Sequence, residues 1–181
     1  MKLGSIALLS IALAGATACG SDGGSAPTCT GTGCVCVDTA CSCTAGADCK
    51  AECFDSACAF ACTTAAKCEG KTTDALTATC NDTSMCKGEG GDSSTVTCNA
   101  MSNCDFKLGA MSTVVCNADS TCKIQVDGGT IACNETSGCN VKCLGNCKTT
   151  CATGAECAVT CGDPGTAATM CSTGVFACGP C

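Results

Sequence analysis

The pattern that decides the fold is complete in one stretch of the chain, Thr95-Val96-Thr97-Cys98-Asn99-Ala100-Met101-Ser102-Asn103-Cys104-Asp105-Phe106-Lys107-Leu108-Gly109. Two short runs, 95–98 and 105–108, alternate residues suited to a core with residues suited to water, as β-strands do. The cysteines between the runs are separated by five residues, and a glycine follows the second run. The stretch therefore predicts a strand, a tight turn, a second strand and a return arc.

The same Cys-x5-Cys unit occurs seven times along the chain. Successive first cysteines are 19, 18, 18, 18, 17 and 18 residues apart, and such a period is typical of a solenoid with one coil per repeat. We predict an all-β fold, a disulfide-stapled parallel β-solenoid of about 18-residue coils over residues 29–181. The simplest pairing closes each unit within its own coil, as Cys43–Cys49, Cys62–Cys68, Cys80–Cys86, Cys98–Cys104, Cys116–Cys122, Cys133–Cys139 and Cys151–Cys157.

Stacking of the coils predicts which side chains point inward. Two positions, one before and one after each turn, should form the core. The column two residues before the turn contains Phe60, Ala78, Val96, Val114 and Ile131. The column two residues after the turn contains Ala51, Gly70, Gly88, Phe106, Ile124, Val141 and Val159.

The outward positions after the turn alternate in charge. Parallel stacking would place neighbours about 4.8 Å apart, where opposite charges stabilise by roughly 0.2–1 kcal/mol per pair and like charges repel. A slip of two residues would set Lys50 against Lys71, so the pattern favours one register. The two columns read Lys50, Glu69, Lys87, Asp105, Lys123 and Glu52, Lys71, Glu89, Lys107.

Asparagine follows the first turn cysteine in four coils, and serine recurs three residues later. Asparagine tolerates left-handed turn conformations, and stacked amides can hydrogen-bond along a ladder. We therefore interpret both columns as turn chemistry. They contain Asn81, Asn99, Asn117 and Asn134, with Ser84, Ser102, Ser120 and Ser137.

Two further cysteine pairs lie where the opposite arc would close, Cys53–Cys58 and Cys143–Cys147. Eight cysteines near the ends remain, and the sequence does not pair them. Bridges between neighbouring coils also have acceptable spacing, so the connectivity stays a hypothesis at this point. The unpaired set is Cys29, Cys34, Cys36, Cys41, Cys161, Cys171, Cys178 and Cys181.

Metal binding and redox chemistry are the rival interpretations of the cysteines. The spacing in residues 34–36 and 41–43 is similar to that of metallothioneins, and thiolates suit zinc or copper(I). Export would favour oxidation, however, and the sparse apolar core needs covalent closure, so we predict disulfides and no bound metal. The terminal Cys178-Gly179-Pro180-Cys181 resembles the thioredoxin redox motif, but no helix can follow it to lower a thiol pKa. A terminal staple is the simpler interpretation.

The N-terminus predicts export. Met1 and Lys2 precede an apolar run over residues 4–14, and small residues lead to Ala16-Thr17-Ala18-Cys19. This pattern resembles the lipobox of bacterial lipoproteins, with Ala16 in place of the usual leucine. The resemblance implies a signal peptide over 1–18, lipidation of Cys19 by acyl chains such as palmitate, and an outer-membrane destination. Residues 19–28 would be the lipidated N-terminus and a flexible linker.

Cysteine parity supports this interpretation, and composition excludes several functions. The chain has 27 cysteines, so lipidation of Cys19 leaves an even number for disulfides. With a net charge of −7, no arginine and few aromatics, nucleic-acid binding is not expected. With no histidine, the common catalytic triads are missing. We expect no enzyme activity, no cofactor and no small-molecule substrate.

One outward strip is almost free of charge. Thr77, Thr95, Thr113 and Thr130 would stack three residues before the turn, and Thr79 and Thr97 one residue before it. Here the strings around Thr79-Cys80 and Thr97-Cys98 resemble the repeat of beetle antifreeze proteins, which are disulfide-bonded β-solenoids. That resemblance covers residues 43–161 and implies ice binding through threonine. The departures are an 18-residue period instead of 12 and asparagine at the second threonine position.

These observations predict a non-enzymatic envelope lipoprotein with a structural or adhesive role. Its partners would be the membrane, through the lipid, and an envelope or surface protein. Ice binding through the threonine strip and metal sequestration by thiolates are the two alternatives.

Overall fold

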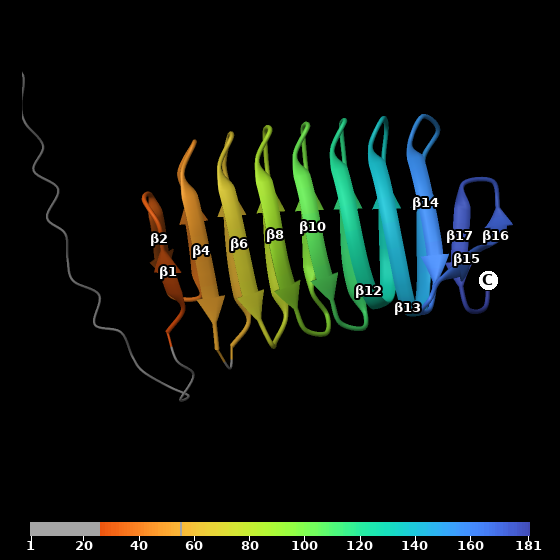
Figure 1. The fold of residues 1–181 in the computed structure, drawn as a ribbon, viewed down its shortest axis with the longest axis horizontal. Coiled ribbons are helices and arrows are strands. Elements are labelled where there is room, and N and C mark those ends of the chain that lie inside the picture. The colour runs from red at the N-terminus through yellow and green to blue at the C-terminus, as the bar shows by residue number, and fades with distance from the viewer. Residues whose placement is uncertain (1–25, 55) are drawn as a thin grey trace, which may run out of the picture.

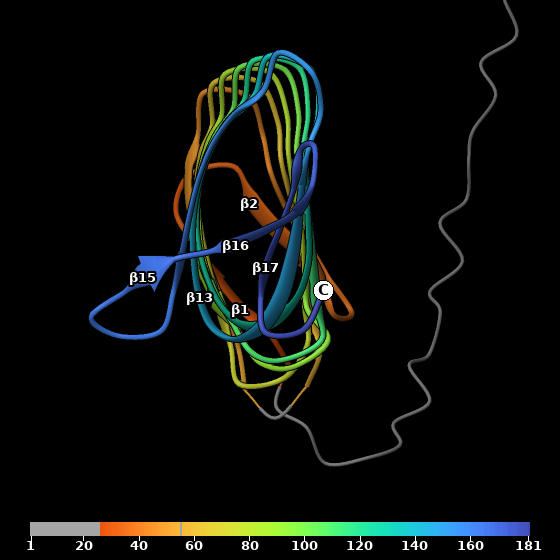
Figure 2. The same ribbon diagram turned by 90° about the vertical axis from the view of Figure 1, so that its right-hand side faces the viewer.

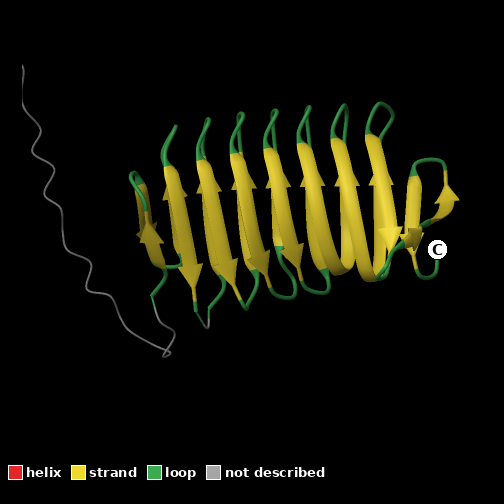
Figure 3. Ribbon diagram, viewed as in Figure 1, coloured by secondary structure: helices red, strands yellow, loops and turns green. Residues whose placement is uncertain are grey.

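The computed structural model describes residues 26–54 and 56–181, which form a β-solenoid of about seven turns with coils of about 18 residues. The strands stack side by side along one axis, as Figure 1 shows. The described residues contain no helix, and the turns between successive stacked strands lie at the two edges of the stack (Figure 3). The predicted signal peptide over 1–18, Cys19 and most of the predicted linker lie outside the described residues.

Each coil contributes one strand to each of two parallel walls, which face each other across a flattened core (Figure 2). The wall that follows the Cys-x5-Cys turns contains β4 (Asp48–Cys53), β6 (Lys67–Thr72), β8 (Met85–Gly90), β10 (Asn103–Leu108), the first parts of β12 (Thr121–Cys133) and β13 (Gly138–Cys151), and β14 (Glu156–Cys161). The wall that precedes them contains β3 (Ala40–Cys43), β5 (Cys58–Cys62), β7 (Leu76–Cys80), β9 (Thr95–Cys98), β11 (Ser112–Cys116) and the second parts of β12 and β13.

The register is the one that the repeat predicts. Cys98 lies beside Cys80 and Cys116 in one wall, and Cys104 lies beside Cys86 and Cys122 in the other. Equivalent residues of successive coils therefore stack directly on one another, which lets backbone hydrogen bonds run along the whole solenoid.

Both predicted inward columns form the core. Val96, Val114 and Ile131 are buried in one wall, and Phe106 and Ile124 are buried in the other. Val159 in the last full coil is only half-buried, because no further coil covers it.

Large and small side chains complement each other across this core. The rings of Phe60 and Phe106 stack with their centroids 6.2 Å apart. A Cβ atom on Gly70 would lie 2.2 Å from the ring of Phe60 in the opposite wall. A Cβ atom on Gly88 would lie 2.7 Å from the ring of Phe106, its neighbour in the same wall, and 2.7 Å from the carbonyl oxygen of Gly70. The two glycines therefore leave room for the two rings.

The predicted amide ladder is confirmed. The Nδ2 atom of Asn99 donates to Oδ1 of Asn81 at 3.0 Å, and Asn117 and Asn134 continue the chain of hydrogen bonds at 2.9 Å each. The asparagines themselves do not take the left-handed conformation that they tolerate. Positive φ falls instead on residues that directly follow them, for example 44° at Ala100 and 59° at Met101. The backbone amide of Met101 then donates to the carbonyl of Ala118 in the next turn at 3.0 Å, which holds this conformation.

Antiparallel strands cap both ends of the solenoid. At the N-terminal end, β1 (Thr28–Thr30) pairs with β4, and β2 (Cys34–Val37) pairs with β3. At the C-terminal end, β15 (Thr166–Ala167) pairs with β14, β16 (Thr169–Ser172) with β17, and β17 (Val175–Cys178) with β13. A stack of parallel strands would otherwise present open edges that template association, and the caps cover them.

Candidate functional surfaces

Disulfides stack through the core as a ladder. Each of the seven Cys-x5-Cys units is closed within its own coil, with Cα–Cα distances of 5.9 to 6.5 Å. We call these seven bridges the disulfide ladder. Sulfurs of neighbouring rungs lie close together, since the Sγ atoms of Cys80, Cys98 and Cys104 are within 4.8 Å of one another. Four of its central cysteines, Cys98, Cys104, Cys116 and Cys122, have no exposed surface.

The remaining bridges close the arcs and the ends. Cys53–Cys58 and Cys143–Cys147 join the two walls opposite the ladder, at the positions expected from spacing. The structure also pairs the eight cysteines that the sequence leaves open, as Cys29–Cys34, Cys36–Cys41, Cys161–Cys178 and Cys171–Cys181. All 26 described cysteines are thus in 13 disulfides.

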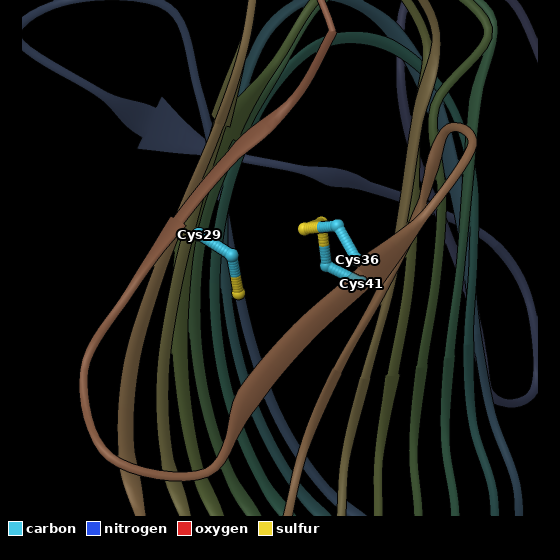
Figure 4. A group of neighbouring side chains, drawn as sticks. All are labelled: Cys29, Cys36 and Cys41. Carbon is cyan, nitrogen blue, oxygen red and sulfur yellow. A yellow bond between two sulfur atoms is a disulfide. The ribbon is translucent and has the colours of Figure 1, made fainter.

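This pairing bears on the rival thiol chemistries. Cys36 and Cys41 form a bridge, and the Sγ atom of Cys29 lies near it inside the N-terminal cap, as Figure 4 shows. These sulfurs lie close enough together to hold a metal ion. They could bind one only after reduction, because a disulfide sulfur is not a thiolate. In the terminal Cys-Gly-Pro-Cys segment, Cys178 and Cys181 bind different partners instead of each other. Each therefore staples the C-terminal cap.

One outer wall carries the predicted threonine strip. We call the two outward rows of the wall that precedes the turns the threonine face. Thr77, Thr95, Thr113 and Thr130 are neighbours in consecutive strands, and all four have exposed surface. Thr79 and Thr97 stack in the second row and are partly exposed. The rows comprise Ala59, Thr77, Thr95, Thr113, Thr130 and Lys148, and Ala61, Thr79, Thr97, Val115, Ala132 and Thr150.

The threonine face extends farther than the sequence predicts. In β2, Val35 and Val37 continue the two rows past β3, and their exposed fractions are 55% and 68%. The alternation Cys34-Val35-Cys36-Val37, with cysteine inward, was a signal of this strand. Its antiparallel pairing lies outside the 18-residue period, so the period could not place it.

The opposite outer wall carries the alternating charges. We call the two outward columns after the turns the charged face, and its neighbours match the predicted register, with Glu69 beside Lys50 and Lys87. Ion pairs join the strands, since Glu89 contacts Lys71 at 3.0 Å and Lys107 at 3.6 Å. The columns contain Lys50, Glu69, Lys87, Asp105 and Lys123, and Glu52, Lys71, Glu89 and Lys107.

The ion pairs shift the pKa of two carboxyl groups. A hydrogen bond from Lys71 and its positive charge, with a smaller contribution from Lys107, lower the pKa of Glu89 below its ordinary value. Lys50 lowers the pKa of Glu52 in the same way, by a hydrogen bond and by its charge, and the pKa of Lys50 is raised in return. Both shifts favour the ionised form of the carboxyl group that makes the ion pair.

Comparison of the chain with protein-family models, curated proteins and solved structures finds no match. Among the described residues, no helix is long and apolar enough to cross a membrane. The described part of the chain is a disulfide-stapled scaffold with two unlike outer faces, one nearly uncharged and one of alternating charge.

Proposed function

We propose that this protein is a non-enzymatic bacterial envelope lipoprotein whose solenoid is a rigid scaffold with a structural or adhesive role. Cysteine parity is the observation that carries the proposal. The chain has 27 cysteines, and the 26 described ones pair entirely among themselves, so no cysteine partner within the chain is left for Cys19. A single leftover thiol is a liability in an oxidising compartment, whereas lipidation removes it.

The number of disulfides agrees with export. Thirteen bridges require an oxidising compartment to form and persist. Acyl chains on Cys19 would hold the scaffold at a membrane surface, with the segment between Cys19 and β1 as the tether. The outer membrane is the destination we propose, since Gly20 follows the lipid cysteine where retained lipoproteins have aspartate.

Intact mass spectrometry with thiol alkylation tests the proposal. We expect protein from a bacterial envelope fraction to begin at Cys19, to carry the added mass of acyl chains there, and to take up no alkylating reagent before reduction. After reduction we expect 26 alkylated cysteines. A Cys19→Ser variant is the matched control, and it should lose the acyl mass and the membrane association while keeping all thirteen disulfides. Unmodified Cys19 in the envelope fraction would overturn the lipoprotein proposal.

Ice binding is a second candidate, because the threonine face is a regular array. Its strands repeat about every 4.8 Å, and its two rows lie roughly 6.7 Å apart along each strand. Each threonine presents a methyl and a hydroxyl group, and Lys148 is the one charged residue of the two rows as defined above. The resemblance to beetle antifreeze proteins favours the same face.

Thermal hysteresis measurements decide this second candidate. If the threonine face binds ice, native protein should lower the freezing point below the melting point, and changing Thr77, Thr79, Thr95 and Thr97 to Lys should abolish the gap. The matched control carries four lysines at exposed threonines elsewhere, Thr64, Thr73, Thr121 and Thr136, and should keep it. Absence of hysteresis in native protein with intact disulfides removes ice binding from consideration.

A further inference from the structure

The charged face alternates in sign along each strand as well as between strands. In β4 the outward pair is Lys50 and Glu52, and in β6 it is Glu69 and Lys71. The strands β8, with Lys87 then Glu89, and β10, with Asp105 then Lys107, continue the alternation. Each charge in the middle of this array therefore has neighbours of opposite sign in both directions.

An array with this symmetry is complementary to itself. A two-fold axis parallel to the solenoid axis would place each strand opposite the same strand of a second copy, running in the opposite direction. The first outward residue of a strand then faces the second outward residue of its counterpart. Lys50 would oppose Glu52, Glu69 would oppose Lys71, and the same holds in β8 and β10. No like charges meet in these four strands, and an isologous interface of this kind is the usual basis of a dimer.

The other two-fold arrangement fails over the length of the sheet. If the solenoid axes ran antiparallel with all seven strands of this wall overlapping, β10 would face itself. Asp105 would then oppose its own copy, as would Lys107, and Lys87 would oppose Lys123. Like charges directly opposite each other repel. Over β4 to β10 alone, however, antiparallel axes would set Lys50 against Asp105 and Lys71 against Glu89, so both two-fold arrangements satisfy the charges of these four strands.

The charges lie where this wall is unobstructed. Beyond β14, the loop around Asp163 and β15 stands out from the same side of the solenoid at its C-terminal end (Figure 2). A flat partner cannot approach closely there. From β4 to β10, by contrast, the outward side chains are well exposed, with 60% for Lys71, 48% for Glu89 and 63% for Lys107.

We infer that the charged face, over β4 to β10, is the binding surface for a second copy of this chain, which lies face to face with the first. The carboxylates that already bind lysines within one chain accept further contacts, because each has two oxygens with several lone pairs. With parallel axes, both N-termini would leave the pair at the same end. That orientation suits two chains anchored in one membrane and in this respect rests on the proposed function, whereas the charge pattern does not.

Sedimentation velocity on the full-length chain with its disulfides formed tests the pair. Because screening shortens the range of exposed charges, we expect a dimer at about 20 mM NaCl whose dissociation constant rises about tenfold or more at about 500 mM. Lys71→Glu should weaken the dimer by a similar factor. Lys148→Glu makes the same charge change on the threonine face and should change the constant less than about twofold. A chain that stays monomeric at low salt and high concentration overturns the inference.

A mixing experiment tests the orientation. In the parallel pair, position 71 of one copy faces position 69 of the other. Lys71→Glu therefore sets two carboxylates against each other, and Glu69→Lys sets two ammonium groups against each other, so each variant alone should dimerise about tenfold or more weakly than native protein. Mixed together, the two variants restore opposite charges in β6, and we expect the heterodimer to bind within a few-fold of native protein.

The outcomes separate the possible arrangements and the two proposals. Rescue of Lys71→Glu by Glu69→Lys assigns parallel axes, and rescue by Glu89→Lys assigns antiparallel axes over β4 to β10. Failure of both variants to rescue Lys71→Glu overturns the inference. Acyl mass at Cys19 is measured on the native protein in a separate experiment. Failure of the dimer and failure of the lipoprotein proposal are therefore distinguishable.

Discussion

Complete reduction of the disulfides is expected to unfold the solenoid. Cysteines make up 18 of the 31 buried residues of the core cluster. The large aliphatic and aromatic side chains in it are few, chiefly Phe60, Phe106, Leu76, Ile124 and Ile131. Closing a loop as short as the Cys-x5-Cys turn stabilises by roughly 2–3 kcal/mol. A few such bridges are already comparable with the roughly 5–15 kcal/mol by which a typical domain is stable, so we expect the apolar core alone not to hold the fold.

Far-UV circular dichroism during reduction measures this result. We expect the β-sheet signal to disappear once all 26 cysteines are alkylated, with the extent of alkylation followed by mass. Reduction should begin at Cys171–Cys181, because Cys181 is exposed, and reach the central rungs of the disulfide ladder last, because they are buried. A fully alkylated chain that keeps its native spectrum would contradict this expectation.

A variant without the terminal bridge is the control. Cys171→Ser with Cys181→Ser removes a disulfide that lies in the C-terminal cap and not in the ladder. We expect its spectrum to match that of native protein, because the seven rungs and both walls remain. The comparison separates loss of covalent closure in the core from a general effect of losing a bridge.

The repetitive part of the fold could be predicted from the sequence because one period fixes several properties at once. The spacing of Cys98 and Cys104, the alternation of Lys87 with Glu69 and Asp105, and the inward Val96 all require the same register. The nine disulfides that the spacing proposed are among the thirteen in the structure. Stacking of equivalent positions also placed the threonine face, whose four outer threonines lie in consecutive strands.

The ends could not be predicted, because the period stops there. The disulfide between Cys29 and Cys34 spans the turn at which the chain reverses into antiparallel β2. Cys161 pairs with Cys178 at a sequence separation of 17. Such pairings depend on how the chain turns back at each end. The stacking of equivalent residues in successive coils gives no information on that. The complementarity of Phe60 with Gly70 was equally out of reach, because the two residues lie in different walls and meet only across the core.

The contact between Phe60 and Gly70 is expected to be sensitive to the size of both side chains. The ring of Phe60 fills the space over Gly70 so closely that a Cβ atom there would lie 2.2 Å from Cε1 and 2.6 Å from Cδ1 of the ring. Phe60→Ala should leave a cavity and lower the free energy of unfolding by about 3–5 kcal/mol. Gly70→Val should overpack the same site and cost about 1–3 kcal/mol.

The double variant tests whether the two residues share one space. With the ring removed, the valine side chain occupies part of the cavity, so Phe60→Ala/Gly70→Val should be more stable than the sum of the two single changes by about 1–3 kcal/mol. Guanidinium unfolding with the disulfides intact measures each free energy. Phe54→Ala is the matched control, because Phe54 is 52% exposed, and it should change stability by less than about 0.5 kcal/mol. Additive costs for Phe60 and Gly70 would show instead that the glycine is required by the backbone and that the ring merely lies beside it.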